Sequence, residues 1–315
     1  MDASVTVLIC TRNRAESLRL TLDSLAAVAV PAGWAVELIV VDNGSTDHTN
    51  EVVAGFSMKG VPVRRVFEPR TGLSVARNTG VAEAKGDVLL FSDDDVRFPA
   101  DWIEGMGRPI LAGEAEAVQG GVRIAPHLER PWLTGALRTW VAAVEDPREG
   151  PEGLVGANMA IGAQTVRRLG GFDTRLGAGA AGFFEDTAMG WAVKSGGGRI
   201  AYRPDVAVVH HFSEDRLNVA TYVSIARRMA ESYALVAVGA GGRPDRPSAY
   251  SLAAQVPFLG VRVVTQGLRR MVGRGVDAGF IVRYHYFRRA IELRRALGPN
   301  GAAAGPARGP GTRTG

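Results

Sequence analysis

Three consecutive carboxylates, Asp93, Asp94 and Asp95, follow an apolar run over residues 88–92 that predicts a buried strand. Like charges at a strand end repel one another, and burial strengthens the repulsion. A divalent cation relieves it, because carboxylate oxygens suit Mg²⁺ and Mn²⁺, and Mg²⁺ usually binds one or two carboxylates together with substrate phosphates. A solvated acidic turn is the other interpretation of an isolated triplet. The surrounding segments decide between the two.

The elements that must position this triplet alternate between strand and helix patterns over residues 1–99. Because this order predicts a mainly parallel sheet covered on both faces by helices, we expect an α/β fold. Ligands in such sheets bind at the carboxyl ends of the strands, where Asp42, Arg70 and Asp93 can converge. The expected strands are 5–10, 37–41, 61–67 and 88–91, and the expected helices are 15–27, one through Val52 and Val53, and 74–84.

The rest of the chain divides into three parts. Residues 100–212 combine strand patterns, loops and short helices, and we expect them to form the acceptor half of a cleft whose nucleotide-binding half is 1–99. Residues 213–297 are helical in pattern, with Arg interleaved among apolar residues. Residues 298–315 lack periodicity and predict a disordered tail. The sequence therefore predicts a catalytic domain over 1–212 and a helical C-terminal extension.

Composition limits the class of partner. The chain has 315 residues, 46% of them hydrophobic and 22% charged, which is typical of a globular protein with one large domain and an appendage or with two domains. Its net charge of +5 fits an anionic partner such as a nucleoside diphosphate or a phospholipid surface. We expect no nucleic-acid partner, because zinc-finger spacing and an RNA-binding aromatic signature are missing from the sequence.

Cys10 is the single cysteine, so the chain cannot form an internal disulfide, and a reducing compartment is expected. Its position within an apolar run predicts a buried strand thiol. The N-terminus does not read as a signal peptide, and the sequence has no uncharged apolar run of membrane-spanning length. We therefore expect a cytoplasmic protein, with peripheral contact at the inner face of a membrane as a further possibility.

Four segments, taken in order along the chain, carry a resemblance to a known family. They are Thr11-Arg12-Asn13-Arg14, the run from Val40 to Asp47 (VVDNGSTD), the run from Gly72 to Gly80 (GLSVARNTG), and Phe183-Phe184-Glu185-Asp186-Thr187. Together with Asp93 and Asp95, which match an Asp-X-Asp motif, they resemble the family 2 glycosyltransferases of GT-A fold over residues 4–212. The resemblance implies transfer of a sugar from a nucleoside-diphosphate sugar.

The resemblance assigns donor-binding roles to residues after the strands. Asp42 would accept hydrogen bonds from uracil or ribose, although a turn-capping aspartate has the same pattern. Thr11, Arg12 and Arg14 would line the nucleotide pocket. Arg70 and Arg77 would donate to the diphosphate, with a surface ion pair as the alternative for Arg70.

A metal site follows from the Asp-X-Asp motif. The resemblance implies that Asp95 binds Mg²⁺ or Mn²⁺ directly and that Asp93 holds the ribose or a metal-bound water, whereas Asp94 points elsewhere in the donor site. The metal would stabilise charge on the leaving nucleoside diphosphate. A histidine completes the site in many relatives, and His210 fits the pattern better than His211. Adjacent strand residues point to opposite faces, so only one of the two can serve.

Glu185 and Asp186 resemble the pair from which the family draws its catalytic base. The base removes a proton from an acceptor hydroxyl as that oxygen attacks the anomeric carbon. We expect Asp186 to be the base and Glu185 to position the acceptor, and direct attack with one base would invert the anomeric configuration. A helix N-cap is the alternative role of Asp186. UDP is the expected donor nucleotide, because it is common in the family, with dTDP and GDP as alternatives. The acceptor hydroxyl is expected to belong to a glycan, a glycolipid or a small molecule.

Two other functions fit parts of the pattern. A phosphatase of the haloacid dehalogenase type also uses an Asp-X-Asp pair, but normally after its first strand and followed by Thr or Val where this chain has Arg97. A non-catalytic relative that binds nucleotide sugars fits if the base is misassigned. The C-terminal Arg-rich segments predict either peripheral membrane contact, through Val256–Leu259 and Arg269–Met271, or packing on the catalytic domain or a second subunit.

Overall fold

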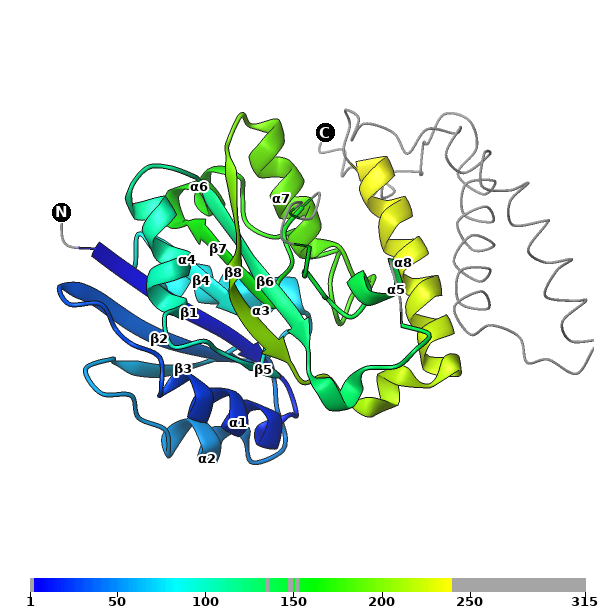
Figure 1. The fold of residues 1–315 in the computed structure, drawn as a ribbon, viewed down its shortest axis with the longest axis horizontal. Coiled ribbons are helices and arrows are strands. Elements are labelled where there is room, and N and C mark those ends of the chain that lie inside the picture. Colours follow the sequence, from blue (N-terminus) through cyan, green and yellow to red (C-terminus); the bar gives the residue numbers. More distant parts are fainter. Residues whose placement is uncertain (1–2, 134–135, 147–149, 151–152, 240–315) are drawn as a thin grey trace, which may run out of the picture.

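The computed structural model describes residues 3–239, except 134–135, 147–149 and 151–152. Their centre is an eight-stranded sheet in the order β3-β2-β1-β4-β7-β6-β8-β5 (Figure 1). The sheet is mainly parallel and is flanked by helices, so the α/β fold class predicted from the sequence is confirmed. The predictions for residues 240–315, including the membrane-contact segments and the tail, lie outside the described residues.

The first half of the sheet has the predicted parallel strands. β1 (Ala3–Thr11) lies between β2 (Trp34–Asp42) and β4 (Val88–Ser92), and β3 (Val63–Phe67) extends the sheet beyond β2. The helices between them are α1 (Ala15–Leu25), α2 (Thr49–Ala54) and α3 (Leu73–Glu83). β3 begins two residues later than expected, since Val61 pairs instead with Met58 in an isolated bridge.

Alternation along the strands separates two apolar layers. Val5, Val7 and Ile9 of β1 pack with α1, α2 and α4 (Trp102–Leu111), whereas Leu8 packs with α3, α6 (Ala163–Arg168) and α7 (Glu185–Ser195). Because successive side chains of a strand point to opposite faces, both layers are built from the same short run. A near-continuous apolar strand is what a sheet covered on both faces requires.

The second half of the sheet has mixed directions. β7 (Asn158–Gly162) is antiparallel to both β4 and β6 (Ala117–Ile124), while β8 (Ile200–His210) is parallel to β6 and antiparallel to β5 (Val96–Arg97). The buried Asn158 ties this half together. Its Nδ2 donates to the carbonyls of Gly121 and Val206, both at 2.8 Å, and its Oδ1 accepts from Trp102 Nε1. The sequence predicted mixed strands here without giving their order.

A third apolar cluster lies beyond the end of β8 and packs under the last described helix (Figure 1). It includes residues from η1 (Pro126–Leu128), α5 (Ala136–Thr139), η2 (Glu214–Leu217) and α8 (Val219–Gly239). Tyr222 is fully buried in it between Trp132 and Trp140. Within the part of the chain that the structure describes, no helix is long and apolar enough to cross a membrane.

Candidate functional site

The acidic triplet lies where two strand ends meet. Asp93 follows the last residue of β4, and β5 starts directly after Asp95. Val96 pairs with His210 at the end of β8, and the His211 amide donates to the Asp95 carbonyl at 2.7 Å. This pairing brings His210 to the triplet although the two are far apart in the sequence. Of the three residues expected to converge at the carboxyl ends of the strands, Asp93 lies here and is joined by His210, whereas Asp42 and Arg70 lie outside the cavity that opens beside the triplet.

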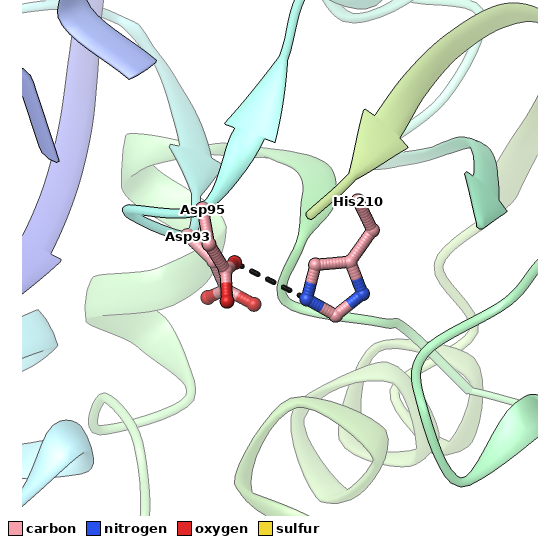
Figure 2. Close-up of side chains that lie close together, drawn as sticks. All are labelled: Asp93, Asp95 and His210. Atoms are coloured by element: carbon pink, nitrogen blue, oxygen red, sulfur yellow. Dashed lines mark ion pairs between the residues drawn. The ribbon is translucent and has the colours of Figure 1, made fainter. Parts of the chain in front are cut away.

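Asp93, Asp95 and His210 form the candidate metal site. Each offers a ligand atom, and these atoms all lie within 4.8 Å of one another. Figure 2 shows the two carboxylates side by side, with the imidazole of His210 facing them from β8. Of the two histidines that the sequence left open, His210 is the one that faces the carboxylates.

The hydrogen bonds of His210 prepare Nε2 to act as a ligand. Its Nδ1 lies 2.9 Å from the carbonyl of Val141, which can only accept, so Nδ1 carries a proton. Nε2 lies 3.1 Å from Oδ1 of Asp95, and although burial acts in the opposite direction, this carboxylate raises the pKa of His210. Once Nε2 loses its proton, it can offer its lone pair to a metal. That Oδ1 is buried and has no well-oriented hydrogen bond from the described residues. An oxygen–oxygen–nitrogen donor set with an unsatisfied buried oxygen fits a divalent cation.

Arg14 and Thr11 hold the triplet from the side of β1. Arg14 donates to Asp94 Oδ1 and to Asp95 Oδ2, both at 2.7 Å, and Thr11 Oγ1 donates to Asp94 Oδ2 at 2.7 Å. Both oxygens of Asp94 therefore have donors within the protein, and Asp94 is not among the residues that form the candidate metal site. The Arg14 side chain is 40% exposed, so it can reach a bound ligand as well.

Burial and neighbouring charges separate the pKa values of the three carboxyls. Burial raises the pKa of Asp93, and it raises the pKa of Asp94 to about 7 against the pull of Arg14. Burial acts in the same direction on Asp95, but His210 and Arg14 outweigh it and hold the pKa of that carboxyl well below its usual value. Asp95 is thus the carboxylate most firmly kept in the charged form that a metal requires.

A cavity of about 300 Å³ opens beside the triplet. Five of the residues predicted to bind the donor line it, namely Thr11, Arg12, Arg14, Asp93 and Asp94, and both Asp95 and His210 face it as well. Its other walls come from the first strand end, the start of α3, the loop before α7 and η2: Cys10, Asn43, Thr71, Gly72, Leu73, Ala76, Ala178, Gly179 and Arg216. Its volume lies at the lower end of the range for small-molecule sites.

Cys10 is only partly buried and contributes its side of β1 to this cavity, whereas the sequence predicted a buried thiol. Cys10 packs at the edge of the apolar layer under α3, where the cavity opens. Burial nevertheless raises the pKa of the thiol to about 12, so the thiol stays protonated at neutral pH.

Three residues predicted to bind the donor are not among those lining the cavity. Asp42 is buried, with Oδ1 accepting from the Ser45 amide at 2.8 Å and Oδ2 accepting from the Arg65 guanidinium. Arg70 donates to Glu68 and its side chain is 74% exposed. These contacts match the alternatives left open for both residues, a turn-capping aspartate and a surface ion pair. Asn43 donates to the carbonyls of Glu68 and Arg70 and so orders the same loop.

Arg77, the third of these residues, is buried between two acidic clusters: the triplet Asp93–Asp95 and the pair Glu185–Asp186. Its Nη1 donates to Glu185 Oε1 at 2.8 Å, and its Nη2 lies 3.5 Å from Asp93 Oδ1. The guanidinium also lies over the ring of Phe172. A Cβ on Gly156 would come within 2.1 Å of Nη2, so a side chain at this position would displace the guanidinium from its present place. Arg77 therefore joins the triplet to the Glu185–Asp186 pair.

Glu185 and Asp186 lie in the first turn of α7. Glu185 is buried, and burial together with the neighbouring Asp186 raises its pKa to about 7, although Arg77 opposes this. Asp186 is half-buried. Its Oδ2 accepts from the Gly156 amide at 2.7 Å, and its Oδ1 accepts from its neighbour Thr187 through the amide at 2.6 Å and the hydroxyl at 3.2 Å. The two carboxylates thus differ in burial and in partners.

The loop before α7 is held in place by both neighbouring helices. The Leu73 amide at the start of α3 donates to the Ala178 carbonyl at 2.8 Å, and Ser232 of α8 donates to the Ala181 carbonyl and accepts from the Phe183 amide. Positive φ values at Gly177, Gly179 and Gly182 allow the tight path. Through Ala178 and Gly179 this loop forms one wall of the cavity.

Arg216 also faces the cavity, although no motif in the sequence points to it. It lies in η2, beyond the span of the resemblance, and its guanidinium packs over the ring of Phe212 at 5.4 Å while facing the cavity. A single arginine in a polar turn gives no signal of its own. Its distance of six residues from His210 becomes informative only once β8 is seen to end at the cavity.

Comparison with known proteins matches this chain to a glycosyltransferase family and to individual proteins similar to it. The model of the family described as Glycosyl transferase family 2 matches residues 6–169. The succinoglycan biosynthesis protein ExoM of Rhizobium meliloti is 29% identical over 227 residues, which are 67% of this chain and 68% of ExoM. The pre-mycofactocin glycosyltransferase of Mycobacterium tuberculosis is 27% identical over 65% of this chain, but the chain spans only 42% of that protein's length.

Solved structures share the fold at lower identity. The mannosyltransferase PcManGT from Pyrobaculum calidifontis, in complex with GDP-Man and Mn²⁺, superposes with a TM-score of 0.63 at 22% identity, covering 92% of this chain and 86% of its own. GalNAc-T7, with UDP, GalNAc and Mn²⁺, gives a TM-score of 0.50 at 19% identity and covers 73% of this chain and 51% of its own. These likenesses establish a GT-A-like fold.

Proposed function

Because the chain belongs to glycosyl transferase family 2, and is thus a nucleotide-sugar-dependent glycosyltransferase, we propose an inverting, metal-assisted reaction for it. A sugar would pass from a nucleoside-diphosphate donor in the cavity to an acceptor hydroxyl. The observation that carries the proposal is the grouping of Asp93, Asp95 and His210 at a cavity, together with Arg77, which links Asp93 to Glu185. Family membership also argues against the phosphatase alternative.

We assign the metal to Asp93, Asp95 and His210, with Mn²⁺ or Mg²⁺ as the ion. When bound, the ion would neutralise the donor diphosphate and stabilise charge on the leaving nucleoside diphosphate. Mn²⁺ is the first choice, since an imidazole nitrogen joins two carboxylate oxygens in the donor set, whereas Mg²⁺ prefers oxygen ligands. Mn²⁺ is also the ion named with PcManGT and with GalNAc-T7.

The nucleoside would lie between the end of β1 and the start of α3. Thr11 and Arg12 reach this part of the cavity, and Arg12 is exposed and donates to Thr71 across the opening. Asp42 would act on the base or ribose only after exchanging the contact that Arg65 now makes. We propose UDP as the donor nucleotide, with GDP and dTDP as the candidates to test beside it, because PcManGT is in complex with GDP-Man and GalNAc-T7 is with UDP.

Asp186 is proposed as the base. The acceptor oxygen would form the bond to the anomeric carbon while its proton passes to the Asp186 carboxylate, and the bonding electrons of the breaking C–O bond would leave with the nucleoside diphosphate. Amide donors from Gly156 and Thr187 fix the carboxylate and leave lone pairs for the proton. Glu185, held by Arg77, would position the acceptor hydroxyl, which belongs to a glycan, a glycolipid or a small molecule.

The test is turnover of nucleotide sugars by the purified full chain. UDP-, GDP- and dTDP-sugars are offered with Mn²⁺ and with a panel of glycan and glycolipid acceptors, and release of nucleoside diphosphate is followed. NMR of the product reports the anomeric configuration. Acceptor-dependent release with inversion is the expected result. Retention of configuration, or equal transfer by Asp186→Asn, would overturn the assigned mechanism.

A further inference from the structure

Arg216 differs from the other buried or half-buried arginines around the cavity. Arg14 bridges Asp94 and Asp95, and Arg77 pairs with Glu185 and contacts Asp93. The guanidinium of Arg216, by contrast, makes no hydrogen bond or ion pair with any residue that the structure describes; its one described contact is with the face of the Phe212 ring. A cation that faces the cavity is thus left without a directional partner.

Arg216 is half-buried, and its guanidinium faces the cavity with only part of its surface open to water. Hydrogen bonds or an opposite charge would compensate a cation in such a position. Burial lowers the pKa of Arg216, while Asp95 and Asp93 act across the cavity in the opposite direction. An arginine nevertheless remains charged at neutral pH and offers five N–H donors in a planar fork. The site is therefore suited to an anion that accepts hydrogen bonds from the Arg216 guanidinium.

Asp93 and Asp95 attract Arg216 only from a distance. A divalent cation at these carboxylates would cancel that attraction and leave Arg216 facing a cationic centre. A donor diphosphate would restore the balance, because its oxygens can bind the metal on one side and a guanidinium on the other. Bidentate phosphate binding is the strongest use of an arginine fork.

We propose that Arg216 binds the diphosphate of the donor, from the η2 side of the cavity, and helps to hold the charge of the leaving group. This role rests on the proposed function. It also explains why η2 follows β8 so closely. The strand that places His210 at the metal site continues, within six residues, into the turn that places Arg216 at the same cavity.

The experiment compares nucleoside diphosphates with monophosphates by isothermal titration into Mn²⁺-loaded protein. GDP, GMP, UDP and UMP are titrated into wild type, Arg216→Ala and Arg216→Lys, with Arg123→Ala as the matched control, since Arg123 is an exposed arginine on β6. Mn²⁺ binding without nucleotide is measured for each. Circular dichroism checks the fold, and Arg216→Gln replaces the alanine variant if that one unfolds.

Arg216→Ala is expected to bind the diphosphate about tenfold to a hundredfold more weakly, the usual value of a hydrogen-bonded charge pair, with monophosphate and Mn²⁺ affinities changed by less than about twofold. Arg216→Lys should recover part of the loss, and Arg123→Ala should show none. Unchanged diphosphate affinity would overturn the proposal, as would an equal loss for both nucleotides or a loss of Mn²⁺ affinity alone. Wild-type protein that binds no nucleoside diphosphate would overturn the proposed function first.

Discussion

The two acidic clusters of this molecule are similar in composition but differ in what their oxygens contact. At the triplet, Asp95 keeps a buried oxygen without a well-oriented hydrogen bond, and the carboxylates face a cavity. In the Glu185–Asp186 pair, both oxygens of Asp186 accept from fixed donors and Glu185 is paired with Arg77. Unsatisfied oxygens suit an ion that enters with a substrate, whereas fixed carboxylates suit a proton acceptor whose position must not vary.

Arg77 lies between the two clusters and provides a positive charge to both, through Asp93 and Glu185. Without it, the carboxyls of Asp93 and Glu185 would have no positive charge between them. We therefore expect substitutions in the triplet to weaken donor binding and substitutions in the Glu185–Asp186 pair to slow sugar transfer. Substitution of Arg77 should do both. Five variants test this division.

The largest effect is expected from Asp186→Asn. Loss of a general base typically costs about 10²- to 10⁴-fold in rate, so transfer should fall by that factor while Mn²⁺-dependent nucleotide affinity stays within about twofold. Steady-state turnover and titration of the same sample measure the two quantities. Asp205→Asn, an exposed carboxylate paired with Arg203, is the control. Loss of nucleotide binding in Asp186→Asn would break the division between the clusters.

Arg77→Met should lower the free energy of unfolding by about 3 kcal/mol, because removing one partner of a buried ion pair leaves uncompensated charge behind. Denaturant unfolding measures this. Both nucleotide affinity and turnover should fall together in the folded fraction. Arg77→Lys keeps the charge but cannot reach both carboxylates as a fork, so it should recover stability better than activity. An Arg77 variant in which nucleotide affinity falls but turnover does not, or the reverse, would contradict the connecting role.

Asp95→Ala should weaken Mn²⁺-dependent nucleotide binding by at least about a hundredfold, since changes even to groups behind metal ligands cost tenfold to a hundredfold. Titration of the nucleotide at fixed Mn²⁺ measures it. Asp94→Asn is the informative comparison, because Asp94 faces Arg14 and Thr11 rather than the candidate metal site, and we expect a smaller loss. Equal losses in the two variants would contradict the ligand assignment.

A smaller effect concerns pH. The pKa of Glu185 is raised to about 7 in the folded protein, above the 4.5 of a free glutamic acid, so its protonated form stabilises the fold at low pH. That contribution, at most about 3 kcal/mol, should be lost as pH rises from about 5 through 7. Thermal unfolding of wild type and Glu185→Gln across this range measures it, and the difference between their Tm values should change by a few degrees. A constant difference would place the pKa near its ordinary value.

The smallest effect is expected from Arg70→Ala. Arg70 is mostly exposed and pairs with Glu68 outside the cavity, and surface pairs contribute about 0–1 kcal/mol. Nucleotide affinity should change by less than about twofold in titration. A tenfold loss would show that Arg70 turns toward the diphosphate when donor binds.

The sequence predicted the parallel half of the sheet well, because its strands and helices are local patterns of apolar residues. β1, β2 and β4 lie where these patterns placed them, and the rule that ligands bind at strand ends located Asp93. For the half with mixed strand directions, the sequence predicted that strands, loops and short helices occur, but not their order or direction. The direction of β7 and the place of β8 depend on pairings between distant segments, and the buried contacts of Asn158 across three strands leave no periodic signal.

The arginines show the same limit within the site. Sequence position brought Arg14, Arg70 and Arg77 near the strand ends, but a long side chain selects its partner in three dimensions. Arg77 turns inward to Glu185 because Gly156 leaves room for it, and Arg70 turns outward to Glu68. Family resemblance supplied the metal site and the acidic pair. It ended before Arg216, whose position depends on the turn that follows β8.

The central claim is that a nucleoside diphosphate binds through a metal held by Asp93, Asp95 and His210. Isothermal titration of UDP, GDP and dTDP into the wild-type protein, with and without Mn²⁺ or Mg²⁺, tests it most directly. We expect one of these nucleotides to bind, and to bind only when the metal is present. Equal affinity without metal, or no binding of any of the three by folded protein, would contradict it.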